Sequence, residues 1–173
     1  MGDPKRPRKS YSRPKSPWRS DQLAQELYLV GTNGLRNKRE LWKTQTKLSA
    51  VRKQARRLLA ASTEVRQREE KKLLDSLTRS GLLGEGSTLD DVLGLSIEDA
   101  LGRRLQSVVF KQGLATSPQH ARQLVTHKHV MIGERVIDIP GYRVTKSEEG
   151  KIHITGLRQP AEPKQEAPPA VQG

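Results

Sequence analysis

Positive charge is concentrated in the first third of this chain, and this asymmetry constrains how that third can fold. Residues 1–57 contain 16 of the 32 Lys and Arg residues but only 4 of the 19 Asp and Glu residues, so they carry nearly all of the net charge of +13. Such a segment must leave most of its side chains outside any core. It is typical of a surface that neutralises the phosphates of nucleic acid. A basic tail that only increases solubility is the alternative.

The composition excludes several classes of protein. No stretch approaches the roughly 18 uninterrupted apolar residues of a membrane-spanning helix, and the first residues lack the apolar core of a secretory signal. We therefore expect a cytoplasmic protein without a membrane partner. The absence of cysteine removes disulfides, thiolate nucleophiles and Cys-ligated metals. With 2 Trp, 3 Tyr and 1 Phe there is little material for an aromatic ligand pocket, so we expect binding through charge and no cofactor.

The chain divides into four parts by its pattern. Residues 1–19 contain Pro, Lys and Arg with almost no aliphatic side chain, which predicts a basic arm that is disordered in the free protein. Residues 20–95 are predicted to form a helical domain and residues 96–158 a second, smaller domain. Residues 159–173 are rich in Pro, Ala and Glu and are predicted to form a disordered tail without a phosphate-binding role.

Helical periodicity dominates the first domain. Apolar side chains recur on one face over residues 21–30, from about residue 42 or 46 to 61, over 64–80, and over a short segment that Ser87 or Thr88 begins and Gly94 ends. Gly31 fits the left-handed residue that closes the first helix. Between the first two helices lies a turn with two glycines, whose backbone amides could approach a phosphate closely.

The second domain combines helices with strands. Ser96 and Asp99 predict a capped helix that continues to about residue 112, and Ser117 followed by Pro118 predicts the start of another. After residue 129 the period changes to alternation, which predicts strands around 130–132, 135–139 and 152–154. The expected fold class is therefore α+β: a mainly helical domain, then two helices packed on a short antiparallel sheet.

The second domain resembles a known family. Residues 103–144 combine an Arg-Leu helix, a Gly-Leu-Ala turn followed by Ser, a His-Ala-Arg-Gln-Leu helix, a His-x-His-Val element and a Pro-x-Tyr-x-Val strand end. This signature closely resembles the S4 RNA-binding domain. Upstream, the segments DQLAQELYLVGTNGLRNKRELW and LSAVRKQARRLL are similar to the N-terminal part of the ribosomal protein S4 family in its archaeal and eukaryotic form. The sequence departs from the family pattern at two positions. It has Gln106 where many members have Asp, and Pro118 where many have Arg.

This resemblance implies a function and partners. It implies a structural constituent of the small ribosomal subunit that binds small-subunit rRNA at a helix junction of the 5′ domain, nucleates assembly and supports translation and its accuracy. It implies the S5 ribosomal protein as a neighbour, a place in the cytoplasmic ribosome, no homo-oligomer and no enzymatic activity. A regulatory or stress-response RNA-binding protein that carries an S4 domain remains the alternative.

The candidate RNA-binding residues are the basic and polar side chains of the arm, the glycine turn, the second helix and the S4-like domain. They are Arg6, Arg8, Lys9, Arg13, Arg36, Lys38, Arg39, Lys47, Arg52, Lys53, Arg56, Arg103, Arg104, Lys111, Ser117, His120, Arg122, Gln123, Thr126, His127, Lys128 and His129.

We expect neither a metal site nor a catalytic residue. His127 and His129 have suitable spacing for a metal pair, but no third ligand is close in sequence. Asp90, Asp91 and Asp99 each fall in the first turn of a predicted helix, where the helix dipole favours a carboxylate. An RNA-modifying enzyme would need a further catalytic domain, for which the pattern offers no candidate. Trp18 and Trp42 could either stack on bases or be buried against a helix.

Overall fold

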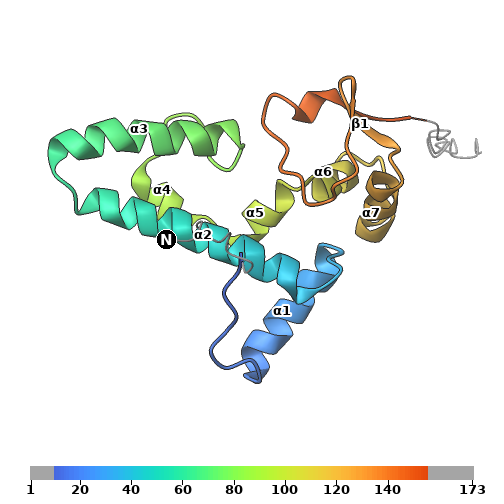
Figure 1. Cartoon of the computed structure of the whole chain (residues 1–173), viewed down its shortest axis with the longest axis horizontal. Helices are drawn as coiled ribbons and strands as arrows, with labels where there is room; N and C mark the ends of the chain where they lie inside the picture. The colour runs from blue at the N-terminus through green and yellow to red at the C-terminus, as the bar shows by residue number, and fades with distance from the viewer. Residues whose placement is uncertain (1–9, 156–173) are drawn as a thin grey trace, which may run out of the picture.

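The computed structural model describes residues 10–155, and in this range α-helices predominate (Figure 1). A short 3-10 turn, Glu149–Lys151, precedes the last strand. The elements in chain order are α1 Ser20–Thr32, α2 Lys38–Leu59, α3 Thr63–Arg79, α4 Leu89–Gly94, α5 Ile97–Gly102, α6 Leu105–Lys111, α7 Pro118–Thr126, β1 Val130–Ile132, β2 Arg135–Val136 and β3 Ile152–Ile154. The predicted α+β class is confirmed.

Helix α2 is the element on which the first half of the molecule is built. It is 22 residues long, and α1, α3, α4 and α5 all pack against it (Figure 1). One stripe of α2 faces a leucine-rich core that α3 and α4 complete. This core contains Leu48, Ala55, Leu58, Leu73, Leu77, Leu89, Val92 and Leu95. The opposite side of α2 is left for charged side chains, as expected of an amphipathic helix.

The second half of the molecule packs α6 and α7 against a three-stranded antiparallel sheet. The strand order is β2-β1-β3, with Met131 opposite both Val136 and His153. A second apolar core lies between the helices and the sheet and includes Leu105, Val109, Ala121, Leu124, Val125, Val130 and Val144. The predicted strands and their order in the chain are confirmed, although β2 is shorter than the pattern suggested.

Local capping rules predicted several helix starts correctly. Thr88 and Asp91 form a capping box at α4, and Ser96 and Asp99 form another at α5. At α7 the hydroxyl of Ser117 accepts a hydrogen bond from the backbone N–H of His120 at 3.1 Å, and Pro occupies the first helical position. These signals depend on neighbouring residues only, which is why sequence reasoning could find them.

The helix expected from residue 97 to about 112 is in fact two helices, and this prediction was wrong. Helix α5 ends at Gly102 and α6 begins at Leu105. Between them, the carbonyl of Arg103 accepts from the N–H of Val144 at 3.0 Å, and the N–H of Leu105 donates to the carbonyl of Tyr142 at 2.8 Å. The chain therefore exchanges helical hydrogen bonds for pairing with residues 142–144, which lie between β2 and β3, at a glycine that weakens the helix.

The glycine turn also differs from the prediction. Helix α1 runs through Gly31 to Thr32, so Gly31 does not close it. Gly34 is the left-handed residue, with φ of 57°. A Cβ atom built on Gly34 would lie 2.8 Å from the Cβ of Pro118 and 2.9 Å from the side-chain nitrogen of Gln106. Only glycine fits here, because the turn touches the second half of the molecule.

The segment before α1 is partly packed. Residues 10–19 were expected to be disordered in the free protein, but Tyr11 stacks on Trp42 with ring centroids 6.0 Å apart. The N–H of Ser12 donates to the hydroxyl of Thr46 at 2.9 Å. Both contacts are made to α2, which begins at Lys38 rather than at residue 42 or 46 as expected from the sequence. The remainder of the arm, residues 1–9, and the predicted tail from residue 159 lie outside the described residues.

Gly34 and Gly31 provide a matched pair of substitutions. We expect Gly34→Ala to lower the free energy of unfolding by about 1–2 kcal/mol from backbone strain alone, and further through the clash with Pro118. Gly31→Ala should raise it by roughly 0.5–1 kcal/mol, because Gly31 is helical and a Cβ there has nothing within 4 Å. Urea denaturation followed by circular dichroism measures both. Equal effects of the two substitutions would contradict the assignment of the left-handed turn to Gly34.

Candidate nucleic-acid interface

The carboxylate of Glu40 binds two arginines from the other half of the molecule. Glu40, in the first turn of α2, accepts hydrogen bonds from Arg104 at 2.6 Å and from Arg122 at 2.7 and 3.2 Å. Arg104 lies just before α6 and Arg122 is in α7, so both guanidinium groups come from the second half. Glu40 is the only acidic residue between Glu26 and Glu64. We call Glu40, Arg104, Arg122 and Gln106 the Glu40 cluster.

Gln106 completes the cluster through its amide. Its side-chain nitrogen donates to the carbonyls of Gly34 and Pro118, both at 2.9 Å, and of Asn33 at 3.2 Å. Its side-chain oxygen accepts from Arg122 at 3.3 Å. Gln106 is almost fully buried, so these bonds satisfy an amide that would otherwise be costly to bury. They tie the glycine turn, α6 and α7 together.

The pKa of Glu40 reflects these neighbours. Partial burial alone would raise the pKa of this carboxyl group, because burial disfavours the charged form. The hydrogen bonds from Arg122 and Arg104 and their positive charges outweigh burial, and the pKa falls below its ordinary value of 4.5. Glu40 is therefore ionised at neutral pH and holds two cations that face the same space.

That space is a cleft between α2 and the segment 139–143, with a volume of about 380 Å³. We call it the α2 cleft. Lys43 and Lys47 line one wall, Arg143 lines the other, and Arg104, Arg122 and Glu40 lie at its base. Among the residues that the structure describes, Lys43, Lys47 and Arg143 form no ion pair with a carboxylate. Five cations thus share one carboxylate.

The pKa values of Lys47 and Arg143, which line the α2 cleft, reflect both desolvation and neighbouring positive charges. Desolvation lowers the pKa of Lys47, and the charges of Arg143 and Lys43 lower it further. The pKa of Arg143 is also lowered. Desolvation of its guanidinium within the cleft is the larger cause, and the charge of Arg104 is the smaller one. Mutual repulsion of this kind is unfavourable in the free protein and is relieved when an anion enters. The cleft is therefore suited to a phosphate group.

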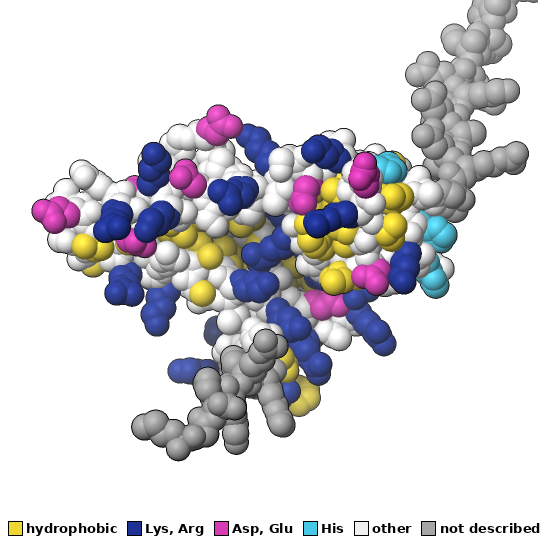
Figure 2. Space-filling view, turned by 45° about the horizontal axis from the view of Figure 1, so that its top comes forward, with side chains coloured by type: hydrophobic (Ala, Val, Ile, Leu, Met, Phe, Trp, Pro, Cys, Tyr) yellow, Lys and Arg dark blue, Asp and Glu magenta, His cyan; other side chains and the backbone are white. Residues whose placement is uncertain are grey.

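The outer face of α2 extends this basic region beyond the cleft. Lys53, Arg56 and Arg57 are exposed, and among residues 10–155 none of the three forms an ion pair. Figure 2 shows Lys and Arg side chains gathered in a band where the two halves of the molecule meet. The predicted cationic face of this helix is thus present, and it continues into the cleft.

Several predicted RNA-binding residues have protein partners. Lys38 pairs with Glu26 at 3.2 Å, and the guanidinium of Arg52 donates to the carbonyl of Leu95. Arg103 pairs with Glu149 at 2.8 Å and also donates to the carbonyls of Ser80 and Val144. Together with Arg104 and Arg122, these side chains hold elements of the protein to one another. No continuous cationic face therefore runs along residues 103–111.

The polar residues predicted around α7 also have local partners. The hydroxyl of Ser117 is the helix cap described above, and the hydroxyl of Thr126 donates to the carbonyls of Arg122 and Gln123 at 3.0 Å. The ring of His120 lies 3.1 Å from the hydroxyl of Thr116.

Other predicted residues are exposed on the surface, and their role in RNA binding stays a prediction: Arg13, Arg36, Arg39, Lys47, Lys53, Arg56, Lys111, Gln123, His127 and Lys128. His129 is partly buried. Arg6, Arg8 and Lys9 lie outside the described residues.

Sequence reasoning missed Lys43 and Arg143. Lys43 lies four residues before Lys47, so both share a face of α2, but the prediction left open whether the helix begins at residue 42 or 46 and did not include Lys43. Arg143 lies inside the Pro-x-Tyr-x-Val element, and only its hydrogen-bonded partner segment brings it to α2. The helical spacing was a usable signal for Lys43, whereas nothing local indicated Arg143.

The glycine turn has a different role from the one predicted. Its amides are used inside the protein: the N–H of Gly34 donates to Gly31 at 3.1 Å and that of Leu35 to Val30 at 2.9 Å. Gly34 itself is buried. These amides are therefore engaged, and the turn acts as a contact between the two halves of the molecule.

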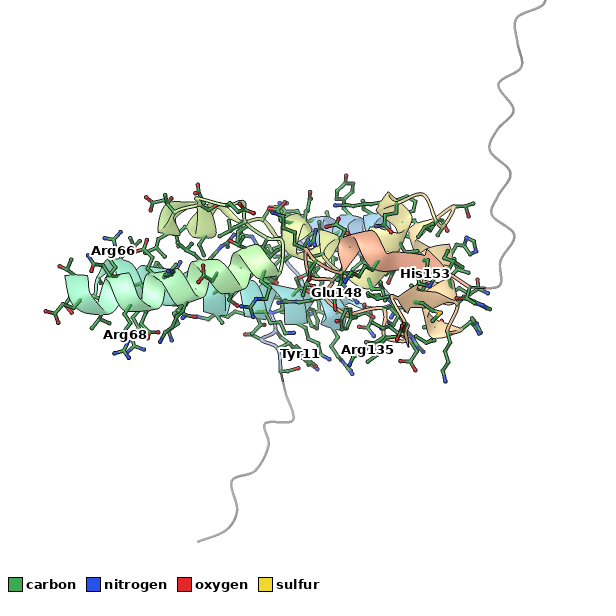
Figure 3. The ribbon with its side chains drawn as sticks, turned by 90° about the horizontal axis from the view of Figure 1, so that it is seen from above. Tyr11, Arg66, Arg68, Arg135, Glu148 and His153 are labelled. Carbon is green, nitrogen blue, oxygen red and sulfur yellow. The ribbon has the colours of Figure 1, made fainter. Side chains whose placement is uncertain are left out.

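The far end of α3 has a mixed charge. Arg66 pairs with Glu70 at 3.1 Å and Lys72 with Glu69 at 3.1 Å. Figure 3 shows Arg66 and Arg68 at one end of the elongated molecule and His153 near the other. Cations that alternate with carboxylates are typical of a face in solvent, so the basic region lies nearer the middle of the molecule.

Residues 10–155 contain no group of three or more His, Cys, Asp or Glu side chains arranged to hold a metal ion. In the same range, no helix combines the length and the apolar character that crossing a membrane requires.

Comparisons with known families cover almost all of the described chain. A sequence model of the ribosomal protein S4/S9 N-terminal domain matches residues 5–102, and a model of the S4 domain matches residues 103–149. The two matches meet where α5 gives way to α6. The predicted division before residue 96 falls earlier, ahead of α5, and stays a prediction.

Curated archaeal proteins are similar over most of their length. The small ribosomal subunit protein uS4 of Cenarchaeum symbiosum is 53% identical over 156 residues, which are 90% of this chain and 76% of that protein. The uS4 protein of Hyperthermus butylicus is 54% identical over 149 residues, covering 86% of this chain and 85% of its own. That of Methanothermobacter thermautotrophicus is 45% identical over 152 residues, covering 88% and 89%.

The Glu40 cluster predicts a large and pH-dependent effect of one substitution. Glu40→Gln should lower the free energy of unfolding by about 2 kcal/mol at pH 7, because two guanidinium groups lose the charge of their partly buried counterion. Since the pKa of Glu40 is lowered in the fold, its contribution is present above its ordinary value of 4.5 and is lost as the pH falls through the lowered value. The difference between wild type and variant should therefore shrink in acid.

Urea denaturation at a series of pH values measures this difference. Glu69→Gln is the control, because its exposed pair with Lys72 should contribute less than about 1 kcal/mol. A Glu40→Gln variant as stable as the control variant would contradict a joining role for Glu40.

Proposed function

The chain belongs to the ribosomal protein S4 family of small-subunit proteins, and from this premise we propose that it binds small-subunit rRNA directly as a structural constituent of the subunit. The observation that carries the proposal is the α2 cleft, where five cations converge on one carboxylate. Phosphate is the anion that RNA presents along its whole length, and each phosphate that is neutralised releases counterions. The relatives named above are small ribosomal subunit proteins, which supports this reading.

The mode of recognition we propose is recognition of RNA shape. The deep major groove of A-form RNA hides its bases from side chains, so proteins contact phosphates and sugars of a folded RNA. The Glu40 cluster joins both halves of the protein, and the α2 cleft lies at their junction. A junction of RNA helices, such as that of the 5′ domain of small-subunit rRNA, offers a concentration of phosphates suited to this surface.

The wider role proposed here follows from the family. The protein takes part in an early step of small-subunit assembly in the cytoplasm, contacts neighbouring ribosomal proteins including S5, and supports accurate translation without catalysing a reaction. The alternation of charge on α3 is consistent with a surface that faces away from RNA. Within the basic arm, residues 1–19, the part that precedes residue 10 adds further positive charge to the chain.

Removal of the unpaired cations of the cleft tests the proposed site. The triple variant Lys43→Gln, Lys47→Gln and Arg143→Gln should bind a 5′-domain rRNA transcript at least tenfold more weakly. The slope of log affinity against log salt should fall by about 2, since each lost contact removes roughly 0.7–0.9. Filter binding at several salt concentrations measures both quantities.

The fold should tolerate this variant, because the substitutions remove charges that repel one another. Arg68→Gln, Lys71→Gln and Lys72→Gln on α3 form the matched control, with the same loss of charge at a distance from the cleft. If both triple variants lose affinity equally, net charge rather than the cleft governs binding. A thermal unfolding curve for each variant confirms that the comparison concerns folded protein.

Sedimentation tests the ribosomal assignment in cells. The full chain with a small tag should sediment with the small subunit in a sucrose gradient and remain in one copy per subunit after a high-salt wash. Quantitative mass spectrometry of the gradient fractions gives the stoichiometry. Release of the protein into the soluble fraction by the wash would favour a regulatory RNA-binding protein that associates only transiently.

A further inference from the structure

The two tryptophans of this chain lie in opposite environments. The indole N–H of Trp42 donates to Glu26 at 3.0 Å, and its ring stacks on Tyr11. Trp42 is thus a structural residue. Trp18, in contrast, is 88% exposed, the highest exposure among the large hydrophobic side chains of the described residues. Tryptophan combines a large apolar ring with a polar N–H and is enriched at interaction surfaces, so an exposed Trp beside a cluster of cations is a candidate contact.

The backbone holds Trp18 in a defined position. Pro17 and Trp18 are the central residues of a turn in which the N–H of Arg19 approaches the carbonyl of Ser16 at 3.4 Å. Proline is favoured at the first central position of such a turn because its φ is preset. On one side the chain is fixed to α2 through Ser12, and on the other α1 begins at Ser20. Figure 1 shows this segment running away from α2 to the lower tip of the molecule.

The charges around Trp18 indicate the chemistry of its partner. Arg13, Lys15 and Arg19 are exposed, and within the described range none of them pairs with a carboxylate. No acidic residue occurs from residue 4 to residue 20. An apolar pocket of a protein would have to accommodate three unpaired cations beside the ring. A single-stranded polyanion with stacking bases matches both the ring and the cations.

We propose that Trp18 is a stacking platform for an unpaired base of RNA, with Arg13, Lys15 and Arg19 contacting the phosphates on either side of that base. The inference rests on the proposed function, because it takes rRNA as the ligand. It adds a contact of a different kind from the α2 cleft. The cleft receives phosphates, whereas the turn requires a base that has left its helix, as bases do in loops and bulges.

Tryptophan fluorescence tests the stacking directly. The chain has 2 Trp, so the difference between wild type and Trp18→Phe isolates the signal of Trp18. On addition of the 5′-domain rRNA transcript, this signal should be quenched and become inaccessible to acrylamide, while that of Trp42 should change little. An unchanged Trp18 signal with wild-type protein bound to the transcript would overturn the inference and leave the proposed function intact.

Affinity provides the second readout. Trp18→Leu and Trp18→Ala should each weaken binding to the transcript about tenfold, whereas Trp18→Phe should keep most of the affinity because its ring still stacks. Val65→Ala, an exposed apolar residue on α3, is the control and should bind like wild type. A leucine variant that binds as tightly as wild type would overturn the stacking role, since leucine is apolar without a ring. Failure of the wild-type protein to bind the transcript would overturn the proposed function and this inference together.

Unfolding measurements separate stacking from a structural effect. Because Trp18 is exposed, none of its variants should shift the thermal unfolding midpoint by more than the control variant does. A lowered midpoint in Trp18→Ala that accounted for the lost affinity would assign Trp18 to the fold and contradict the proposal.

Discussion

The ion pairs of Glu40 are a central contact between the two halves of this protein. Glu40 is isolated in a long basic stretch, and it receives two guanidinium groups from residues that lie 64 and 82 positions further along the chain. Without it, Arg104 and Arg122 would face Lys43, Lys47 and Arg143 across the same cleft with no counterion. Buried ion pairs do not stabilise proteins in general, but the loss of one partner is costly. The position of the two halves therefore depends on Glu40.

The same cluster explains why basic residues in this chain divide into two groups. Arg103, Arg104 and Arg122 form hydrogen bonds with carboxylates and carbonyls of the protein, and arginine is suited to this because it donates in several directions. Within residues 10–155, Lys43 and Lys47 have no such partner. The first group positions the second, because Arg104 and Arg122 bind Glu40 on α2, the helix that carries Lys43 and Lys47.

Local rules predicted most of the secondary structure. The capping boxes at Thr88 and Ser96, the proline start of α7 and the alternation in the strands all depend on residues within a few positions of one another. The errors occurred where distant segments meet. The helix break after Gly102 depends on pairing with residues 142–144, and the early start of α2 places Lys38 and Glu40 at contacts with α1 and α7.

The candidate site was predicted only in part for the same reason. The cationic face of α2 follows from helical spacing, but a single sequence does not show which arginines have carboxylate partners. Glu40 was the available signal, since a lone acidic residue among so many cations is expected to be paired. Arg143 had no such signal, because its place in the cleft depends on contacts between residues 103–106 and 140–144.

The length of α2 has a mechanical consequence. At 1.5 Å per residue, its 22 residues make a rod of about 33 Å. The aromatic stack of Tyr11 on Trp42 and the α2 cleft lie toward one end of this rod, and the contacts with α3 and α4 lie toward the other. A helix packed along most of its length bends little, so its two ends keep a constant separation. The α2 cleft is therefore held at a set distance from the leucine-rich core that α3 and α4 complete at the other end.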